Sequence, residues 1–236
     1  MTWTLKDPAS GDEIIPGNTT ASTTGFLFDV THFGIRKGGR RFYSLEGQQL
    51  RAHVIDSPGP DYSIPISSNP VLVTPVLRGV TNNKRYFVTV VWDTSNTNPD
   101  HLQYNELDGS FVASFPFSDS PFQKRRALVF LEHEYYVLQP EDGDTTPGGV
   151  VVYDVRGQFI RSWSLPASQQ GRGITTDGKH IYVSNLAIPQ QLWKFDVYGR
   201  LIRTYSFGIG EDFAPRWPIT FNGRYIIMNT NRVAPP

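Results

Sequence analysis

LWKFDVYGRLIRTYSFG, from Leu192 to Gly208, reads as two short strands joined by a tight turn at Tyr198-Gly199. The same pattern, an aromatic-rich strand, a glycine turn and a second strand of alternating apolar residues, occurs three more times. The other copies are RFYSLEGQQLRAHVID (Arg41–Asp56), LQYNELDGSFVASFPF (Leu102–Phe117) and VVVYDVRGQFIRSWSLP (Val150–Pro166). The turn glycines are 62, 48 and 42 residues apart, which fits a structural repeat of roughly 40–50 residues.

The best-defined repeat begins just after Arg172. Gly173–Thr176 reads as a short strand, Asp177-Gly178 is a hairpin signal, and Lys179–Ala187 reads as a second strand. The pair of strands from Leu192 completes a four-stranded antiparallel meander, which is the unit of a β-propeller. The sequence therefore predicts an all-β fold, a small propeller of about five, alternatively four, such blades.

We expect a single propeller domain over residues 1–236. Its predicted blades are approximately 14–56, 71–117, 126–166, 172–208, and 216–231 together with 2–6.

The two ends of the chain are predicted to share the last blade. Thr2–Leu5 (TWTL) resembles Ser162–Leu165 (SWSL), the end of an outer strand, whereas residues 216–231 contain only two strands. Closure of the ring by the N-terminal strand removes free sheet edges, which promote aggregation. The alternative is that Thr2–Leu5 is a frayed arm. Because this blade lacks an obvious third strand, it has three strands, a partner supplies one, or the ring has four blades and an N-terminal extension.

Composition excludes several classes of function. The chain has 22 basic and 22 acidic residues and no cysteine, so general attraction to nucleic acid, disulfides and thiolate metal sites are not indicated. The N-terminus MTWTLKDPASG lacks a secretory pattern, and no apolar run approaches the roughly 20 residues of a membrane helix. We expect no membrane insertion, and the sequence leaves the compartment unknown.

The repeat from Gly173 to Phe207 resembles the repeats of NHL-type and related six-bladed-class propellers. The resemblance rests on Asp177-Gly178, Ile181–Val183, Asn185, Lys194–Asp196 and Gly199, and it extends to Asp154 and Gly157 in the preceding blade. It implies a propeller and little about activity, because such propellers include RNA-binding and protein-binding modules as well as lactonases and lyases with metals in the channel.

The long connections are predicted to lie on one face of the ring. In a meander the first–second and third–fourth strand turns share one face, and here they are minimal. The connections on the opposite face are long, and long loops on a rigid scaffold usually carry the binding site. They are 57–70, 94–101, 118–125, 141–149, 167–171 and 208–215.

Arginines at the starts of inner strands are the candidate ligand-binding residues. Several guanidinium groups near the mouth of the channel would recognise a carboxylate, sulfate or phosphate. The alternative is that each arginine pairs with a carboxylate of a neighbouring blade, such as Glu211 or Asp212. Trp217 is a candidate for stacking against a sugar or another ring, or else a core residue. The predicted residues are Arg78, Arg126, Arg172, Arg216 and Trp217.

No catalytic or metal-binding pattern emerges. The five histidines are scattered without an HxH or HxxxH pair, and nucleophile, phosphate-loop and dinucleotide motifs do not occur. His101, with Asp93 and Asp100, is the one carboxylate–imidazole cluster on the long-loop face, and it also reads as an ordinary polar loop. We expect no cofactor and no metal.

Three functions remain open. The leading hypothesis is a non-enzymatic structural module that binds a protein or glycan through the long-loop face, plausibly in a virion or an extracellular assembly, with self-assembly as one option. The second is a hydrolase or lyase that acts on an anionic substrate in the channel. The third is RNA binding, which the short run Lys124–Arg126 alone does not support.

Overall fold

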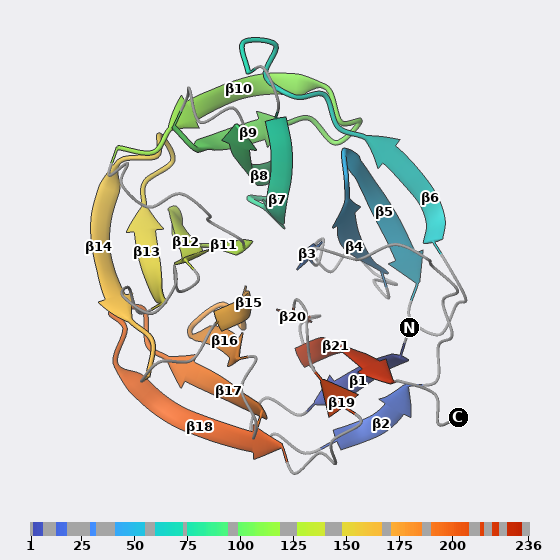
Figure 1. Cartoon of the computed structure of the whole chain (residues 1–236), viewed down its shortest axis with the longest axis vertical. Coiled ribbons are helices and arrows are strands. Elements are labelled where there is room, and N and C mark those ends of the chain that lie inside the picture. The colour runs from blue at the N-terminus through green and yellow to red at the C-terminus, as the bar shows by residue number, and fades with distance from the viewer. Residues whose placement is uncertain are drawn as a thin grey trace.

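The computed structural model describes residues 2–6, 13–17, 29–31, 41–54, 60–72, 75–93, 99–118, 127–139, 148–166, 171–185, 190–207, 213–214, 219–221 and 226–232. These residues form five antiparallel β-sheets arranged in a ring, and none of them is helical (Figure 1). The predicted all-β propeller is confirmed, and the described sheets number five.

Three consecutive sheets follow the predicted meander from the inner to the outer strand. The first of them contains β7 (Pro75–Asn82), β8 (Phe87–Asp93), β9 (His101–Asn105) and β10 (Phe111–Pro116). The next contains β11 (Ala127–Leu131), β12 (Glu134–Gln139), β13 (Gly149–Tyr153) and β14 (Phe159–Ser164). The third contains β15 (Gly171–Thr176), β16 (Ile181–Asn185), β17 (Gln190–Phe195) and β18 (Leu201–Phe207).

The sheet that precedes these three differs from the prediction. It contains β3 (Asp29–Thr31), β4 (Arg41–Glu46), β5 (Gln49–Val54) and β6 (Pro60–Pro65). The hairpin in Arg41–Asp56 therefore forms the two middle strands, whereas we expected the third and fourth. A hairpin with a glycine turn has the same local pattern at either radial position. The outer strand β6 lies within 57–70, which the sequence predicts as a connection. It begins and ends with proline, which an edge strand tolerates.

The closing sheet is built from both ends of the chain, as predicted. β1 (Thr2–Lys6) pairs with β21 (Ile226–Arg232), and β2 (Glu13–Gly17) pairs with β1. β20 (Ile219–Phe221) and β19 (Phe213–Ala214) both pair with β21. The sequence predicts the N-terminal strand as the outer, fourth strand, and this detail is wrong: β1 is the third strand, and β2, which the sequence places in the first blade, is the fourth. The chain itself supplies the strand that the sequence left unassigned.

The inner strands close the ring. Each of them lies beside the inner strand of the next sheet, in the order β3, β7, β11, β15 and β20, and β20 lies beside β3. Consecutive sheets therefore face each other as blades around a common centre (Figure 1).

Apolar side chains fill the space between consecutive blades. Val150 and Val152 on β13 belong to the cluster shared with the β15–β18 sheet, whereas Val151 and Tyr153 belong to the cluster shared with the β7–β10 sheet. Both faces of the strand are buried, so its sequence reads as a continuous apolar run. Removal of this surface from water is the main stabilising contribution to such a fold, at roughly 25 cal/mol per Å².

Candidate interaction surface

Tight turns between the third and fourth strands place the outer strands. In the turn after β17, one carboxylate oxygen of Asp196 accepts the N–H groups of Tyr198 (3.0 Å) and Arg200 (2.9 Å). Asp154 does the same for Arg156 (2.8 Å) and Gln158 (2.9 Å) in the turn after β13. The aspartate of the repeat motif is therefore occupied by its own turn, which is a structural role.

Each turn glycine also packs against the end of the preceding blade. Ser118, just after β10, donates its N–H to the carbonyl of Gly157 (3.0 Å). Ser67, just after β6, donates its N–H to the carbonyl of Gly109 (2.9 Å). The third turn glycine, Gly199, lies against the indole of Trp163 on β14. These contacts fix the outer strand of one blade to the next.

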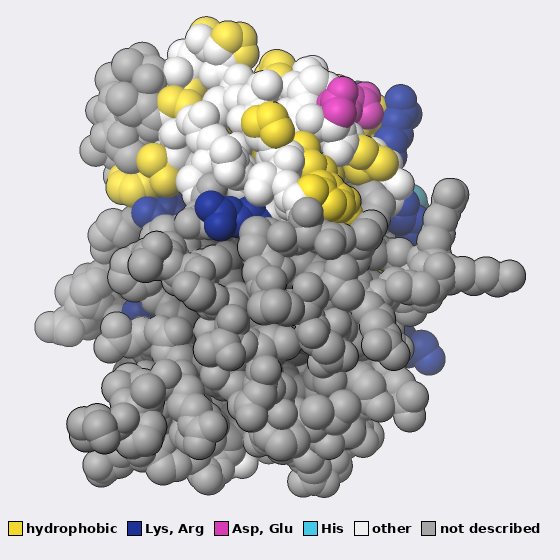
Figure 2. Space-filling view, turned by 90° about the vertical axis from the view of Figure 1, so that its right-hand side faces the viewer, with side chains coloured by type: hydrophobic (Ala, Val, Ile, Leu, Met, Phe, Trp, Pro, Cys, Tyr) yellow, Lys and Arg dark blue, Asp and Glu magenta, His cyan; other side chains and the backbone are white. Residues whose placement is uncertain are grey.

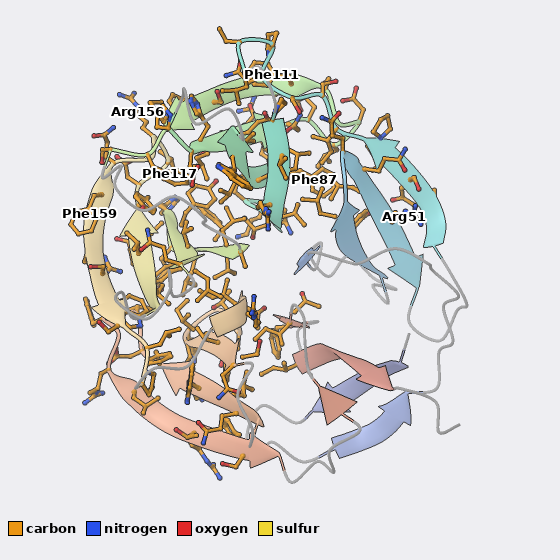
Figure 3. All side chains as sticks on the ribbon, viewed as in Figure 1. Arg51, Phe87, Phe111, Phe117, Arg156 and Phe159 are labelled. Carbon is orange, nitrogen blue, oxygen red and sulfur yellow. The ribbon has the colours of Figure 1, made fainter. Side chains whose placement is uncertain are left out.

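Exposed apolar side chains follow each of the three turns. Two consecutive apolar residues stand at the start of β10, of β14 and of β18. Each of the three turns also carries an apolar or aromatic residue before its glycine. Phe159 on β14 is 48% exposed and Ile202 on β18 is 45% exposed. In Figure 3, Phe111, Arg156 and Phe159 lie at the rim of the ring, whereas Phe87 and Phe117 lie inside it. We call the following residues the outer apolar band: Leu107, Phe111, Val112, Val155, Phe159, Ile160, Tyr198, Leu201 and Ile202.

Figure 2 views the side of the molecule where β6 lies. Over the described surface it shows separate hydrophobic side chains among polar and backbone atoms, with a few basic and acidic side chains beside them.

An arginine side chain makes hydrogen bonds in two neighbouring blades. Arg161 on β14 forms a bidentate pair with Glu134 on β12, with one N–O distance of 2.9 Å, and it also donates to the carbonyl of Val197 (3.0 Å) in the next blade. The hydrogen bonds from Arg161 hold the pKa of the Glu134 carboxyl below its usual range. The guanidinium group also lies over the ring of Tyr198, 5.8 Å from its centroid. Tyr198 is 78% exposed, yet this contact supports one side of its ring.

The predicted arginines fall into two groups. Arg78 on β7 and Arg172 on β15 lie on inner strands and are half-buried, and the guanidinium of Arg78 lies over the ring of Trp92 at 5.3 Å. Arg78 and Arg172 belong to blades that are separated by the β11–β14 sheet. Arg126, Arg216 and Trp217 lie outside the described residues. Convergence of the arginines on one anion therefore stays a prediction.

Histidines make local contacts. His101 has its Nδ1 3.3 Å from the hydroxyl of Ser114, and the neighbouring Asp100 is buried. His180 has its Nδ1 3.0 Å from the carboxylate of Asp177, which also accepts the hydroxyl of Tyr182 at 2.8 Å. Burial alone would raise the pKa of Asp177, but hydrogen bonds from His180, the backbone and Tyr182 together lower it. Asp177 therefore serves the β15–β16 turn.

In the described part of the chain, no three histidine, aspartate or glutamate side chains gather as a metal site requires. The same residues include no helix of the length and apolarity needed to cross a membrane.

Sequence reasoning missed the outer apolar band. Its signal was present as Phe111-Val112, Phe159-Ile160 and Leu201-Ile202, each two residues after a turn glycine. Apolar pairs in a strand ordinarily indicate core. Here they precede the part of the outer strand that packs inward, at Trp163 or Tyr205.

Solved structures share the fold of this chain. A glutaminyl cyclase from Myxococcus xanthus is 9% identical with a TM-score of 0.56, over 88% of this chain and 90% of the other. A protein of unknown function from Bacteroides caccae is 11% identical with a TM-score of 0.51, over 86% and 72%. The WD40 β-propeller domain of Doa1 is 10% identical with a TM-score of 0.43, over 80% and 57%. At these identities the first two likenesses show the fold alone. No protein-family model and no curated protein matches the chain.

Proposed function

We propose that this chain is a non-enzymatic propeller module that binds a protein partner, and that the outer apolar band is part of its binding surface. The proposal treats residues 1–236 as one propeller domain. An assembly, in a virion or outside a cell, is the setting in which we place it.

The observation that carries the proposal is the repetition of apolar pairs at the start of β10, β14 and β18, in which every residue except the half-buried Phe111 is exposed. Single exposed apolar residues are normal on a protein surface, whereas here they recur at the start of three neighbouring outer strands. Protein interfaces are enriched in aromatic residues and arginine, and the band carries Phe159 and Tyr198 with Arg156 and Arg203 beside them.

The long-loop face remains a second predicted binding region. Most of its loop residues lie outside the described part of the chain, so the sequence alone supports its role. The sequence allows a protein or a glycan at that face, whereas the outer apolar band favours a protein, because it offers apolar side chains and edge strands.

Site-specific photo-crosslinking tests the proposal. A photoreactive amino acid would replace Ile160 or Ile202 in the band, or Lys84 in the exposed turn between β7 and β8 as the matched control. The experiment is run once in an extract of the organism that makes the protein and once with the purified protein alone, where only self-association gives a product. We expect one crosslinked product of defined mass from each band position in one of these experiments, and none from Lys84. Equal products from all three positions, or no product from the band, would overturn the proposal.

A further inference from the structure

We propose that two copies of this chain associate through the rim around β10, in a symmetric dimer in which Glu106 of each copy pairs with Arg156 of the other. This inference rests on the proposed function for one part of the outer apolar band, the part that adjoins the turn at Gly109. It names a second copy as the partner there, and it leaves β14 and β18 to the partner that the crosslinking tests.

Glu106 has a different role from the acidic residues at the same place of the other two turns. Asp154 and Asp196 stand there, and each accepts two backbone N–H groups of its own turn. In the first turn Asp108 provides the acceptor instead, since its carboxylate accepts the N–H (2.9 Å) and the hydroxyl (2.7 Å) of Ser110. The carboxylate of Glu106 is exposed and makes no hydrogen bond or ion pair within the described residues. It is therefore available to a cation of another molecule.

Arg156 is an exposed cation in the turn before β14. Its backbone N–H is held by Asp154 (2.8 Å), but over the described ranges its guanidinium makes no hydrogen bond or ion pair. The third turn differs, because Arg200 there is paired with Asp196 at 3.1 Å. The second turn has Gln158 at the position of Arg200. The guanidinium of Arg156 therefore remains available to a carboxylate of another molecule.

These two opposite charges lie at the two ends of β10. Glu106 precedes the strand, in the turn at its start. The turn of Arg156 packs against the other end, where Ser118 donates its N–H to the carbonyl of Gly157 (3.0 Å). Figure 3 shows Phe111 and Arg156 on the same stretch of the rim. When two copies of β10 lie antiparallel across a two-fold axis, each Glu106 meets an Arg156, and both pairs form together.

Exposed apolar side chains stand beside both charges. Leu107 follows Glu106, and Val155 precedes Arg156; they are 45% and 43% exposed. Val112, near the start of β10, is 38% exposed. A second copy would cover these side chains and surround them with the two ion pairs, which is the usual arrangement of an apolar interface centre and a polar rim.

The connection between β6 and β7 adds an apolar projection beside β10. Val71 is 77% exposed, whereas Asn69 is buried. The side chain of Asn69 accepts the N–H of Val71 (3.0 Å) and donates to the hydroxyl of Ser114 on β10 (2.7 Å), and its backbone N–H is accepted by Gln103 (2.9 Å). Figure 1 shows this connection, in teal, projecting past β10. A turn that is already held in place loses little entropy when a second copy docks on it.

Sedimentation velocity of the full chain tests the dimer, at concentrations from about 1 μM to about 1 mM. We expect a reversible equilibrium of monomer and dimer, because a two-fold interface closes on itself. The dimer should weaken as salt is added, since the Glu106–Arg156 pairs lie at the surface. A monomer over the whole range, or an open series of larger assemblies, would overturn the inference.

Charge reversal identifies the interface. Glu106→Arg and Arg156→Glu should each weaken the dimer about tenfold, because two attractive pairs become repulsive. The double variant should restore the dissociation constant to within about threefold of the parent value. Lys179→Glu, in the exposed turn between β15 and β16, is the matched control and should leave the dimer unchanged. A double variant as weak as the single ones, or an equal effect of Lys179→Glu, would overturn the pairing. Thermal unfolding checks that every variant folds.

Truncation of the projecting side chain is a test that does not depend on charge. Val71→Ala should weaken the dimer about fivefold through loss of apolar contact. Leu201→Ala removes an exposed apolar side chain of β18, outside the proposed dimer, and should have no effect. Unchanged association of Val71→Ala, or an equal loss in Leu201→Ala, would contradict an interface at β10.

The proposed function is judged separately. Crosslinking from Ile160 and Ile202 reports on β14 and β18, whereas sedimentation of the charge variants reports on β10. A monomeric chain that still gives crosslinked products would contradict only the dimer. Absence of crosslinking from the band would contradict the broader proposal, even in a chain that dimerises.

Discussion

The carbonyl oxygen of Pro65 lies against Gly109 so closely that a side-chain carbon at position 109 would stand 1.9 Å from it. Pro65 ends the outer strand of one blade, and Gly109 stands in a turn of the next. The glycine is needed for two reasons: its φ of +89° and the approach of a neighbouring backbone. Gly157 is similar, because a side-chain carbon there would stand 2.9 Å from the carbonyl oxygen of Pro116.

Alanine substitutions separate these two reasons. Gly109→Ala should cost about 1–2 kcal/mol from the left-handed backbone and about 1–3 kcal/mol more because the neighbouring backbone must move. Gly178 is the matched control, since its φ is +90° and nothing lies within 4 Å of the added carbon. Gly178→Ala should show only the first cost. Chemical denaturation measures both free energies of unfolding. Equal losses would contradict the close contact between the blades.

The pair Arg161–Glu134 should contribute to stability across the blade boundary. Arg161→Lys keeps the charge but loses the bidentate geometry and the bond to Val197, so we expect a loss of about 1–2 kcal/mol. Arg156→Lys, at an exposed position of the turn before β14, should change stability by less than about 0.5 kcal/mol. Denaturant unfolding of both variants provides the comparison. A larger effect at position 156 would contradict a stabilising role of the Arg161–Glu134 pair between the blades.

Stability should fall in acid, in part through Glu134. Hydrogen bonds from Arg161 lower its pKa in the folded state, whereas an unfolded glutamate titrates near about 4.3. The folded state therefore binds the proton less readily, so this stabilisation is complete above that pH and is lost as the pH falls through the lowered folded pKa. Glu134→Gln should be less stable than the parent at neutral pH, and the gap should narrow in acid. Thermal melts across the acid range measure this, and a constant gap would disprove the assignment.

Removal of residues 1–17 should abolish cooperative folding. The deletion removes β1 and β2 and leaves β21 as an exposed edge, which favours aggregation. We expect the truncated chain to aggregate, and a synthetic peptide of residues 1–17 added during refolding to restore a soluble, cooperatively melting protein. Light scattering and circular dichroism follow the two effects. An unchanged melting temperature without residues 1–17 would contradict closure of the ring by these strands.

Local chemistry explains which parts of the fold were predictable. The turn at Asp196 and Gly199 depends on hydrogen bonds and a backbone angle within five residues, so its pattern is visible in any copy of the repeat. The same holds for the Asp177-Gly178 turn. The position of a hairpin between the centre and the rim of the ring depends on segments outside the hairpin. For that reason the sequence predicts β4 and β5 one strand too far outward.

The candidate surface was less predictable than the fold. Arg78 and Arg172 occupy inner strands, but the sequence does not say what each guanidinium group faces. Leu201 and Ile202 read as core because their apolar character is the same wherever they stand. Both are exposed because they stand at the start of an outer strand, a position that the sequence does not reveal.

The sequence by itself determined the antiparallel meander, its glycine turns and the sharing of one blade between the two ends of the chain. The meander and its turns follow from alternation of side chains, backbone angles and hydrogen bonds among near neighbours, and the shared blade follows from the presence of only two predicted strands in residues 216–231. Only the tertiary structure decided which strand is outermost, which glycines meet another blade and which apolar residues reach the surface. Those depend on contacts between segments far apart in the chain, such as Pro65 with Gly109 and Arg161 with Val197.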